Sequence, residues 1–583
     1  MGRSRARRGT PEHAGALRQD AATRHLCTGV HLDPAFRTTV LRQVHNDSRH
    51  LVAPSYGFDL VPVVQHAWRA WWMETAQHLG VLAVFGVGFA VIPAAAVAAL
   101  CVLAFWELAR LAGRSALVVL PLRAKEVADH WLRRTRWRSE SDELRHHARL
   151  LRLSGTGCAL SVVAALLAAG LAQDPPAGTA RTAAVLLLLA AAVVAGKGAA
   201  RQLSLNHMHG ADSLRPRRLS RRQQAISDQQ SHPYVVYRRP VPKDPEAEPD
   251  RLGWDLVDEG QSPFVGSGTL VHRWLPPLTI QLLEPVSIVD AMEHRPMEVR
   301  EYVNAPFQTH ELVAYLKRAM APMGDADDPN ALRGFTVNDR LYIAESDVPP
   351  AAAWLRTTPG QPAIDRIIDA PYLAEHHFLE IGASVAGEIV TTVFLRVTVK
   401  GKALSLDFAT CALTRTPAEY HVLNFYRESG AGAVLRSTLR ALLALPTQVT
   451  AAWHLAQAPA LIIGALRARR NRVLKPHRRT AVAARISVRE EKSTPWKDTR
   501  LDDVTIHDHM KLIEQRLLKA VQDFLEERKV DTSAFKKRAD SIVNTGVLNM
   551  GGKVDMSQSA IGPQAHVRAD SREPDQHSGP STA

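Results

Sequence analysis

The sequence contains little cysteine. Four cysteines occur in 583 residues, at Cys27, Cys101, Cys158 and Cys411. Small secreted domains held together by disulfides use cysteine more densely and at repeated spacings. We therefore expect no disulfide framework, and we expect the soluble part of the chain to lie in a reducing compartment.

We also expect no cleavable signal peptide. The first residues, MGRSRARRGTPEH, are basic, but the first apolar run begins only near residue 79. A signal peptide carries its apolar core directly behind the basic residues. Residues 1–78 are therefore predicted to be a basic N-terminal region.

Motifs of known enzyme classes are absent as well. The stretch FVGSG is neither a nucleophile elbow nor a phosphate-binding loop, so Ser267 is expected to be a turn residue. The neighbours His376 and His377 begin a predicted strand, where successive side chains face opposite ways, so they should not converge with Glu380. We predict no catalytic residue and no cofactor.

Residue types that bind metals occur close together in HLCTGVHLD, which contains His25, Cys27, His31 and Asp33. Their spacing matches no established zinc pattern. The acidic loop GDADDPN, residues 324–330, lacks the glycine that a calcium loop of the EF-hand type requires at its turn. We predict no metal site at either place.

Three long apolar runs are present, at residues 79–106, 153–173 and 182–200, and only the last contains a charged residue, Lys197. A helix needs about 20 residues to cross roughly 30 Å of hydrocarbon. The second and third runs each fit one crossing and form a helical hairpin around DPPAGTA. Arginine-rich flanks predict that the flanks are cytoplasmic and the short connection is outside.

The first run leaves two alternatives open because Pro93 lies near its centre. The chain either turns near Pro93 and returns, or crosses once as a tilted, kinked helix. A return gives an even number of crossings and places both termini in the cytoplasm, which is the arrangement we predict. No ionisable group lies deep in these runs, so we expect anchoring helices that pack through small residues and form homo-oligomers, not a transporter.

The net charge of +14 is unevenly distributed. Residues 251–430 contain 15 basic and 23 acidic side chains, whereas basic clusters flank the apolar runs. This placement favours binding to anionic lipid headgroups over binding to nucleic acid. The residues predicted to bind the membrane surface are Arg215, Arg217, Arg218, Arg221, Arg222, Arg467, Arg469, Arg470, Arg472 and Lys475.

The transmembrane region is predicted at residues 79–200. It is followed by a basic and Pro-rich linker at 201–253 and by an α+β domain at 254–430. Alternating apolar residues predict a meander of three strands at 377–383, 388–399 and 403–413. Other predicted elements are a strand, Pro-Pro break and strand at 268–284, a helix at 308–323, and a strand pair around Asn338 and Asp339.

Three further regions complete the predicted organisation. Residues 431–480 form an apolar segment with a basic run, in which the charge-free stretch 441–466 either lies in the membrane interface, as we expect, or crosses. Residues 481–543 form amphipathic helices. Residues 544–583 form a Gly/Asn-rich tail whose part 544–567 either associates with copies of itself or is flexible.

Three landmarks carry a resemblance to a known group. The stretches CTGVHLDPAFRTTVLRQVHNDSRHLVAPSYGFDLVPV, PFVGSGTLV and VDTSAFKKRADSIVNTGVLNMGGKVDMSQSAIG resemble large actinobacterial multi-pass membrane proteins to which no activity is assigned. The resemblance implies a bacterial plasma-membrane location and no catalytic residues. The tail also resembles short amyloid-like signalling motifs of bacterial defence systems.

Together these features predict helical transmembrane hairpins followed by a cytoplasmic α+β domain, a C-terminal amphipathic helix and a Gly/Asn-rich tail. The predicted function is that of a membrane-anchored scaffold or signalling protein. The alternative is a membrane-tethered enzyme that acts on a lipid or a nucleotide through the α+β domain.

Overall fold

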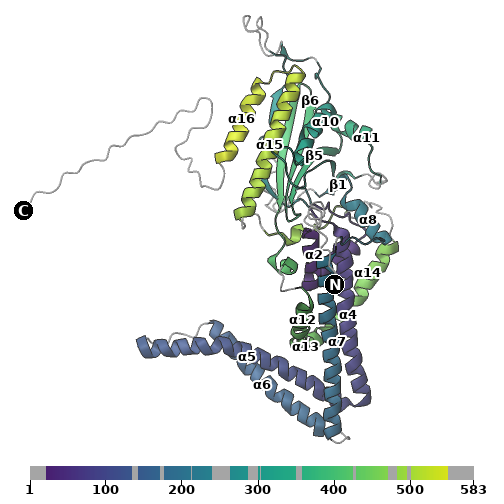
Figure 1. Ribbon diagram of the computed structural model, residues 1–583, viewed down its shortest axis with the longest axis vertical. Coiled ribbons are helices and arrows are strands. Elements are labelled where there is room, and N and C mark those ends of the chain that lie inside the picture. The colour runs from purple at the N-terminus through teal and green to yellow at the C-terminus, as the bar shows by residue number, and fades with distance from the viewer. Residues whose placement is uncertain are drawn as a thin grey trace, which may run out of the picture.

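The molecule has a long helical part and a sheet-containing part, stacked end to end (Figure 1). Among the described residues, five segments are long and apolar enough to cross a membrane: Leu60–Val91, Pro93–Lys125, Leu144–Ala168, Gly178–Gly210 and Leu445–Arg469. The computed structural model describes residues 21–133, 142–170, 176–211, 213–238, 263–285, 300–302, 304–348, 357–424, 429–470, 482–494 and 500–548.

The first apolar run consists of two helices, α4 (Leu60–Val91) and α5 (Pro93–Arg133). Ile92 between them has extended backbone angles, φ −138° and ψ 90°. The ring of a proline disfavours helical angles at the residue before it, and proline is well suited to the first position of a helix. Pro93 therefore ends α4 and starts α5, as the returning arrangement of this run requires.

Helix α6 (Asp142–Gly170) and helix α7 (Pro176–Gly210) follow. The junction of α4 with α5 lies at the end of the molecule away from the sheet, where α6 also ends and α7 begins (Figure 1). Buried apolar side chains of α4, α5 and α7 form one cluster there. Gly88 allows the close approach, because a Cβ at this position would lie 2.7 Å from the Leu186 side chain.

The apolar stretch 441–466 is divided into short pieces. It runs through α12 (Ala431–Leu443), α13 (Leu445–Thr450), the 3₁₀ helix η8 (Ala451–Gln457) and α14 (Ala458–Arg470). Helix α12 packs along α7, where a Cβ at Gly198 would lie 2.8 Å from Ala441. The stretch is thus apolar enough to cross, but it is not one straight helix, and its relation to lipid stays a prediction.

The second part is an α+β unit built on a mixed sheet. The strands are β1 (Tyr234–Tyr237), β2 (Thr269–Arg273), β3 (Leu278–Gln281), β4 (Thr336–Ala344), β5 (Glu375–Val385), β6 (Ile389–Lys400) and β7 (Ala403–Leu413). Their order is β1-β4-β5-β6-β7-β2, and β3 also pairs with β7. Only the β1 and β4 pair is parallel. The predicted meander is β5, β6 and β7.

The predicted strand pair around Asn338 and Asp339 is wrong, since β4 is one continuous strand. Asn338 and Asp339 lie opposite Glu380 and Leu379 of β5. The Asp339 carboxylate is 2.6 Å from Lys317 Nζ and 3.0 Å from His377 Nε2 of β5, so it pairs with a helix and a neighbouring strand and does not make a turn.

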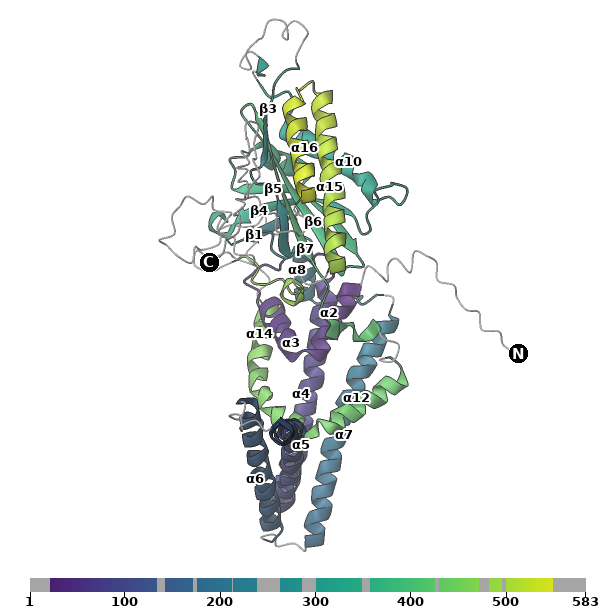
Figure 2. The same cartoon turned by 90° about the vertical axis from the view of Figure 1, so that its left-hand side faces the viewer.

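Helices cover one face of the sheet. The predicted helix at 308–323 is α10 (Thr309–Met320), which contacts α11 (Gln361–Asp369) and α15 (Arg500–Glu527). Helix α16 (Ser533–Leu548) lies beside α15 (Figure 2). Met510, Ile513, Leu517 and Phe524 of α15 are buried against the sheet. Such burial of one helix face is the main source of stability for a helix in water.

The other face of the sheet packs against segments from the N-terminal half. Tyr56 and Phe264 join Phe378, Phe394 and Tyr342 in a second buried cluster. The Phe264 and Phe394 rings are stacked with centroids 4.0 Å apart. The N-terminal region is therefore part of the core of the α+β unit.

Candidate functional site

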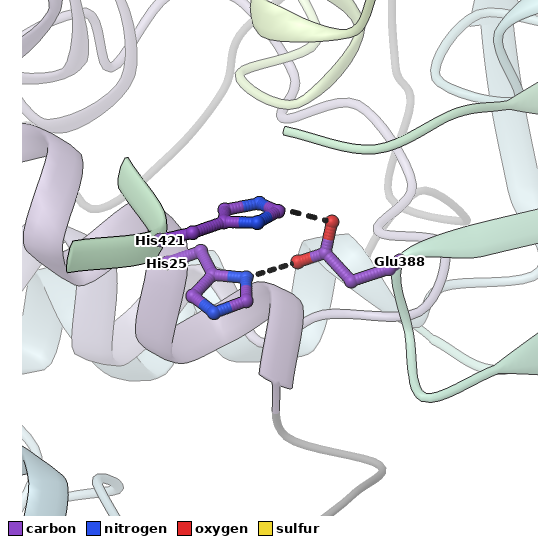
Figure 3. Close-up of side chains that lie close together, drawn as sticks. All are labelled: His25, Glu388 and His421. Carbon is purple, nitrogen blue, oxygen red and sulfur yellow. Dashed lines mark hydrogen bonds and ion pairs between the residues drawn. The ribbon is translucent and has the colours of Figure 1, made fainter. Parts of the chain in front are cut away.

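Three titratable side chains from distant parts of the chain meet where the helical part joins the sheet. His25 comes from α2 (Ala21–Leu32), Glu388 precedes β6, and His421 comes from the 3₁₀ helix η6 (Ala418–Asn424). One ligand atom from each lies within 4.8 Å of the others. Figure 3 shows the two rings lying against one carboxylate.

The contacts within this group are short. His25 Nδ1 is 2.5 Å from Glu388 Oε1, and His421 Nε2 is 3.8 Å from Glu388 Oε2. The two imidazole rings are stacked with centroids 4.0 Å apart. The exposed fraction of the side chain is 5% for His25, 11% for Glu388 and 20% for His421, so the group opens to solvent on the His421 side.

A tight turn places Glu388. Ala386 and Gly387 connect β5 to β6 with φ values of 55° and 73°, the left-handed conformation of a two-residue hairpin. Thr416, which follows the end of β7, holds the carboxylate because its backbone N–H donates to Glu388 Oε2 at 3.0 Å. The turn and Thr416 therefore fix the orientation of the Glu388 carboxylate.

The surroundings keep Glu388 ionised. Burial would raise the pKa of its carboxyl, but the hydrogen bond and charge of His25 act against burial and lower the pKa to about 2. The Thr416 amide and the charge of Arg489 add to this effect. Burial, followed by the charge of His25, lowers the pKa of His421 below its usual value. The carboxylate therefore remains negative at neutral pH.

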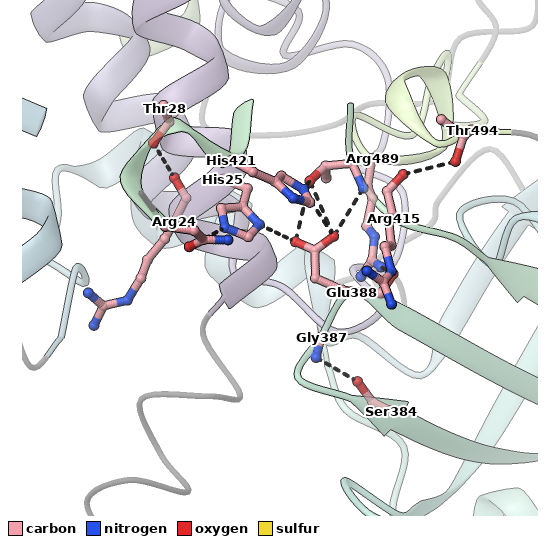
Figure 4. Close-up of polar contacts among 12 residues, drawn as sticks. Arg24, His25, Thr28, Ser384, Gly387, Glu388, Arg415, His421, Arg489 and Thr494 are labelled. Atoms are coloured by element: carbon pink, nitrogen blue, oxygen red, sulfur yellow. Dashed lines mark hydrogen bonds and ion pairs between the residues drawn. The ribbon is translucent and has the colours of Figure 1, made fainter. Parts of the chain in front are cut away.

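Arg489 connects the group to the N-terminal segment. Its side chain is wholly buried and lies beside Glu388 (Figure 4). The guanidinium donates to the backbone carbonyls of Tyr56 and Glu388, both at 2.7 Å. Burial lowers the pKa of Arg489 to about 10, so the side chain is charged at neutral pH. One side chain thus joins three segments of the chain.

A second buried network lies nearby on the sheet. Glu380 Oε2 accepts from Tyr56 Oη and from Arg340 Nε, each at 2.8 Å. Arg340 also donates to the His232 carbonyl at 2.7 Å. Burial would lower the pKa of Arg340, but the charge of Glu380 raises it above the usual range. As predicted from strand alternation, His376 and His377 have separate partners, Arg396 and Asp339.

The four residues of HLCTGVHLD that were considered as metal ligands do not meet in one site. His31 is paired with His66, with the ring nitrogens 3.3 Å apart, and Cys27 is buried in an apolar cluster. Asp33 begins α3 (Pro34–Thr39) by accepting from the N–H groups at positions 35 and 36. Of these four residues, His25 alone belongs to the group with Glu388 and His421, partners that no local spacing could have indicated.

The predicted membrane-surface residues have different surroundings. Arg217, Arg218, Arg221, Arg467 and Arg469 are exposed. Arg215 is exposed but pairs with Asp59 at 3.1 Å. Arg470 belongs to α14, and Arg472 and Lys475 lie outside the described residues.

The prediction for Arg222 is wrong. Its side chain is buried and donates to the carbonyls of Val44, His45 and Asp47 at 2.7–2.9 Å. All these bonds face the protein interior, so Arg222 is not free to contact lipid. It instead fastens α8 (Arg221–Gln230) to the N-terminal segment.

Much of this site lies in a part of the chain that matches a known protein family. Residues 277–557 match the family model of the AbeC-like domain. The AbeC-like region contains Glu388, His421 and Arg489, whereas His25 and Tyr56 precede it. No curated protein and no solved structure matches the chain. The resemblance to actinobacterial membrane proteins therefore stays a prediction.

Proposed function

We propose that the protein is a membrane-anchored scaffold or signalling protein of the bacterial plasma membrane, with its AbeC-like region held against the cytoplasmic ends of the membrane helices. The observation that supports this most is Arg489, whose buried guanidinium joins Tyr56, four residues before α4, to the Glu388 hairpin. Buried polar contacts of this kind fix orientation. This contact would hold the AbeC-like region at a set position relative to the membrane helices.

The distribution of basic residues supports contact with anionic lipid. Helix α8, which begins at Arg221, lies beside the end of α14, which carries Arg467 and Arg469 (Figure 1). Both lie near the level where the helical part meets the sheet. Each basic residue near an anionic surface contributes about 1 kcal/mol of attraction. Lipid headgroups are therefore the proposed partner of this edge.

The proposed topology predicts the result of a reporter map. Because α4 and α5 are separate helices joined at Ile92, reporters fused after residue 138 and at the C-terminus should be cytoplasmic, and a reporter after Gly178 should be outside. Paired alkaline phosphatase and fluorescent protein fusions measure this. The proposal would be contradicted if the reporters after residue 138 and at the C-terminus were outside the cell and the reporter after Gly178 were inside.

The proposed self-association predicts the effect of a tail deletion. Residues 544–567 mostly lie outside the described residues, and their low charge and alternating apolar residues suit stacking with other copies. Removing them should reduce the oligomer size of the full-length protein in detergent, measured by light scattering after size-exclusion chromatography.

Deleting residues 568–583 provides the matched control, because it shortens the same tail without removing the alternating stretch. The control should keep the wild-type oligomer size. If both deletions leave the size unchanged, the tail does not mediate self-association.

The alternative function, a membrane-tethered enzyme acting on a lipid or a nucleotide, draws on the His25, Glu388 and His421 group. Two histidines and one glutamate are the ligand set of several zinc hydrolases. However, two hollows in the described part of the chain are lined around Leu51 to Ser55 and contain none of the three residues. The scaffold role is therefore the better supported proposal.

A further inference from the structure

His25 has an oxygen atom opposite each ring nitrogen. Nδ1 is 2.5 Å from Glu388 Oε1, and Nε2 is 3.2 Å from Asn424 Oδ1. An imidazole nitrogen that faces a carboxylate oxygen is a pair of atoms that can ligate one metal ion together. The pair of Nδ1 and Oε1 is therefore a candidate for holding a cation.

His421 completes a set of ligands for such a cation. Its Nε2 is 3.8 Å from the second carboxylate oxygen, and its ring is stacked on that of His25. Zinc bonds of about 2.1 Å place neighbouring ligand atoms of a tetrahedral site roughly 3.4 Å apart. A metal ion therefore requires the His25 and Glu388 pair to open slightly and His421 to move inward.

The neighbouring polar groups match those that support metal ligands. Ligating histidines usually donate their second N–H to an oxygen, which fixes the ring, and Asn424 Oδ1 is placed for this at His25. Thr416 holds the carboxylate through its backbone N–H and its hydroxyl, which is 3.2 Å from Oε2. His421 is the most exposed of the three side chains, so solvent reaches the group from its side.

We propose that His25, Glu388 and His421 bind one divalent transition-metal ion, with zinc as the best fit and water as the fourth ligand. Two imidazole nitrogens suit zinc, whereas magnesium and calcium prefer sets of oxygen ligands. The ion would join α2 to the β5–β6 hairpin and to η6. This inference does not rest on the proposed scaffold role.

Zinc content of the full-length protein in detergent tests the proposal. After chelator treatment and titration with zinc alone, the wild-type protein should bind one ion per chain, measured by mass spectrometry of the metal. His421→Ala should bind at least about 100-fold more weakly, because a direct ligand is removed. His25→Ala should have the same effect.

His310→Ala is the matched control. His310 Nδ1 is 2.6 Å from Asp369, so it is also a histidine beside a carboxylate, but the described residues provide no third ligand there. The control should bind zinc as the wild type does. The proposal would be overturned if His421→Ala bound zinc as tightly as the wild type, or if His310→Ala weakened zinc binding as much as His421→Ala does.

His421→Cys separates loss of a ligand from loss of folding. A thiolate at this position would remain a metal ligand, and cobalt(II) bound to it should show the sulfur charge-transfer absorption that the wild-type complex lacks. Cobalt binding by the wild type without this band in the cysteine variant would also overturn the proposal.

Discussion

Replacing Glu380 with leucine should lower the free energy of unfolding of the α+β unit by about 3–5 kcal/mol, because one partner of a buried ion pair is removed. The exposed side-chain fractions are 9% for Arg340 and 4% for Glu380, so the remaining guanidinium would be buried without its counterion. Tyr56 Oη would also lose its acceptor. Denaturant unfolding of the purified protein, followed by hydrogen exchange in β4 and β5, measures the effect.

The double variant Glu380→Leu with Arg340→Met is the control. Replacing both members of a buried ion pair by apolar side chains is often much less destabilising than removing one. The double variant should therefore recover a large part of the lost stability. A single variant as stable as the wild type would show that the pair contributes little to this unit.

Replacing Arg489 with methionine should destabilise the junction of the helices and the sheet by about 2–4 kcal/mol. The carbonyls of Tyr56 and Glu388 would lose their buried donor, and each unsatisfied group costs about 1–3 kcal/mol. Methionine also removes the penalty of burying a charge, so we expect less than the full sum. Hydrogen exchange should increase around Tyr56 and in the β5–β6 hairpin.

Arg238→Met is the matched control for Arg489. The Arg238 side chain is 61% exposed and pairs at 3.1 Å with Glu345, whose side chain is 21% exposed, and such pairs near the surface contribute about 1 kcal/mol or less. If the two arginine variants have equal effects, Arg489 does not fasten the junction.

Local sequence patterns predicted several elements correctly because the responsible forces act between near neighbours. Alternating side chains indicated β5, β6 and β7, and the prolines at 276 and 277 separated β2 from β3. The same reasoning failed for β4, where Asn338 and Asp339 resemble a turn. The partners of Asp339, Lys317 and His377, lie on other elements, so its carboxylate is satisfied within a strand.

The candidate site could not be predicted from spacing. His25 and Glu388 are separated by 363 positions, and their contact depends on how α2 docks against the β5–β6 hairpin. The burial of Arg222 was missed for a similar reason, since its three carbonyl partners come from residues near 45. A charged residue in a basic cluster resembles a surface residue until its distant partners are known.

The distance along the chain between Tyr56 and Arg489 has a consequence during translation. The two residues are 433 positions apart, and ribosomes add about 5–20 residues per second. The Tyr56 carbonyl and the segment around His25 therefore emerge roughly 20–90 s before Arg489 is synthesised. Until then the membrane helices can insert and pack against the N-terminal segment, but the Tyr56 carbonyl lacks its Arg489 donor, so the newborn chain depends on chaperones or on water to satisfy this group.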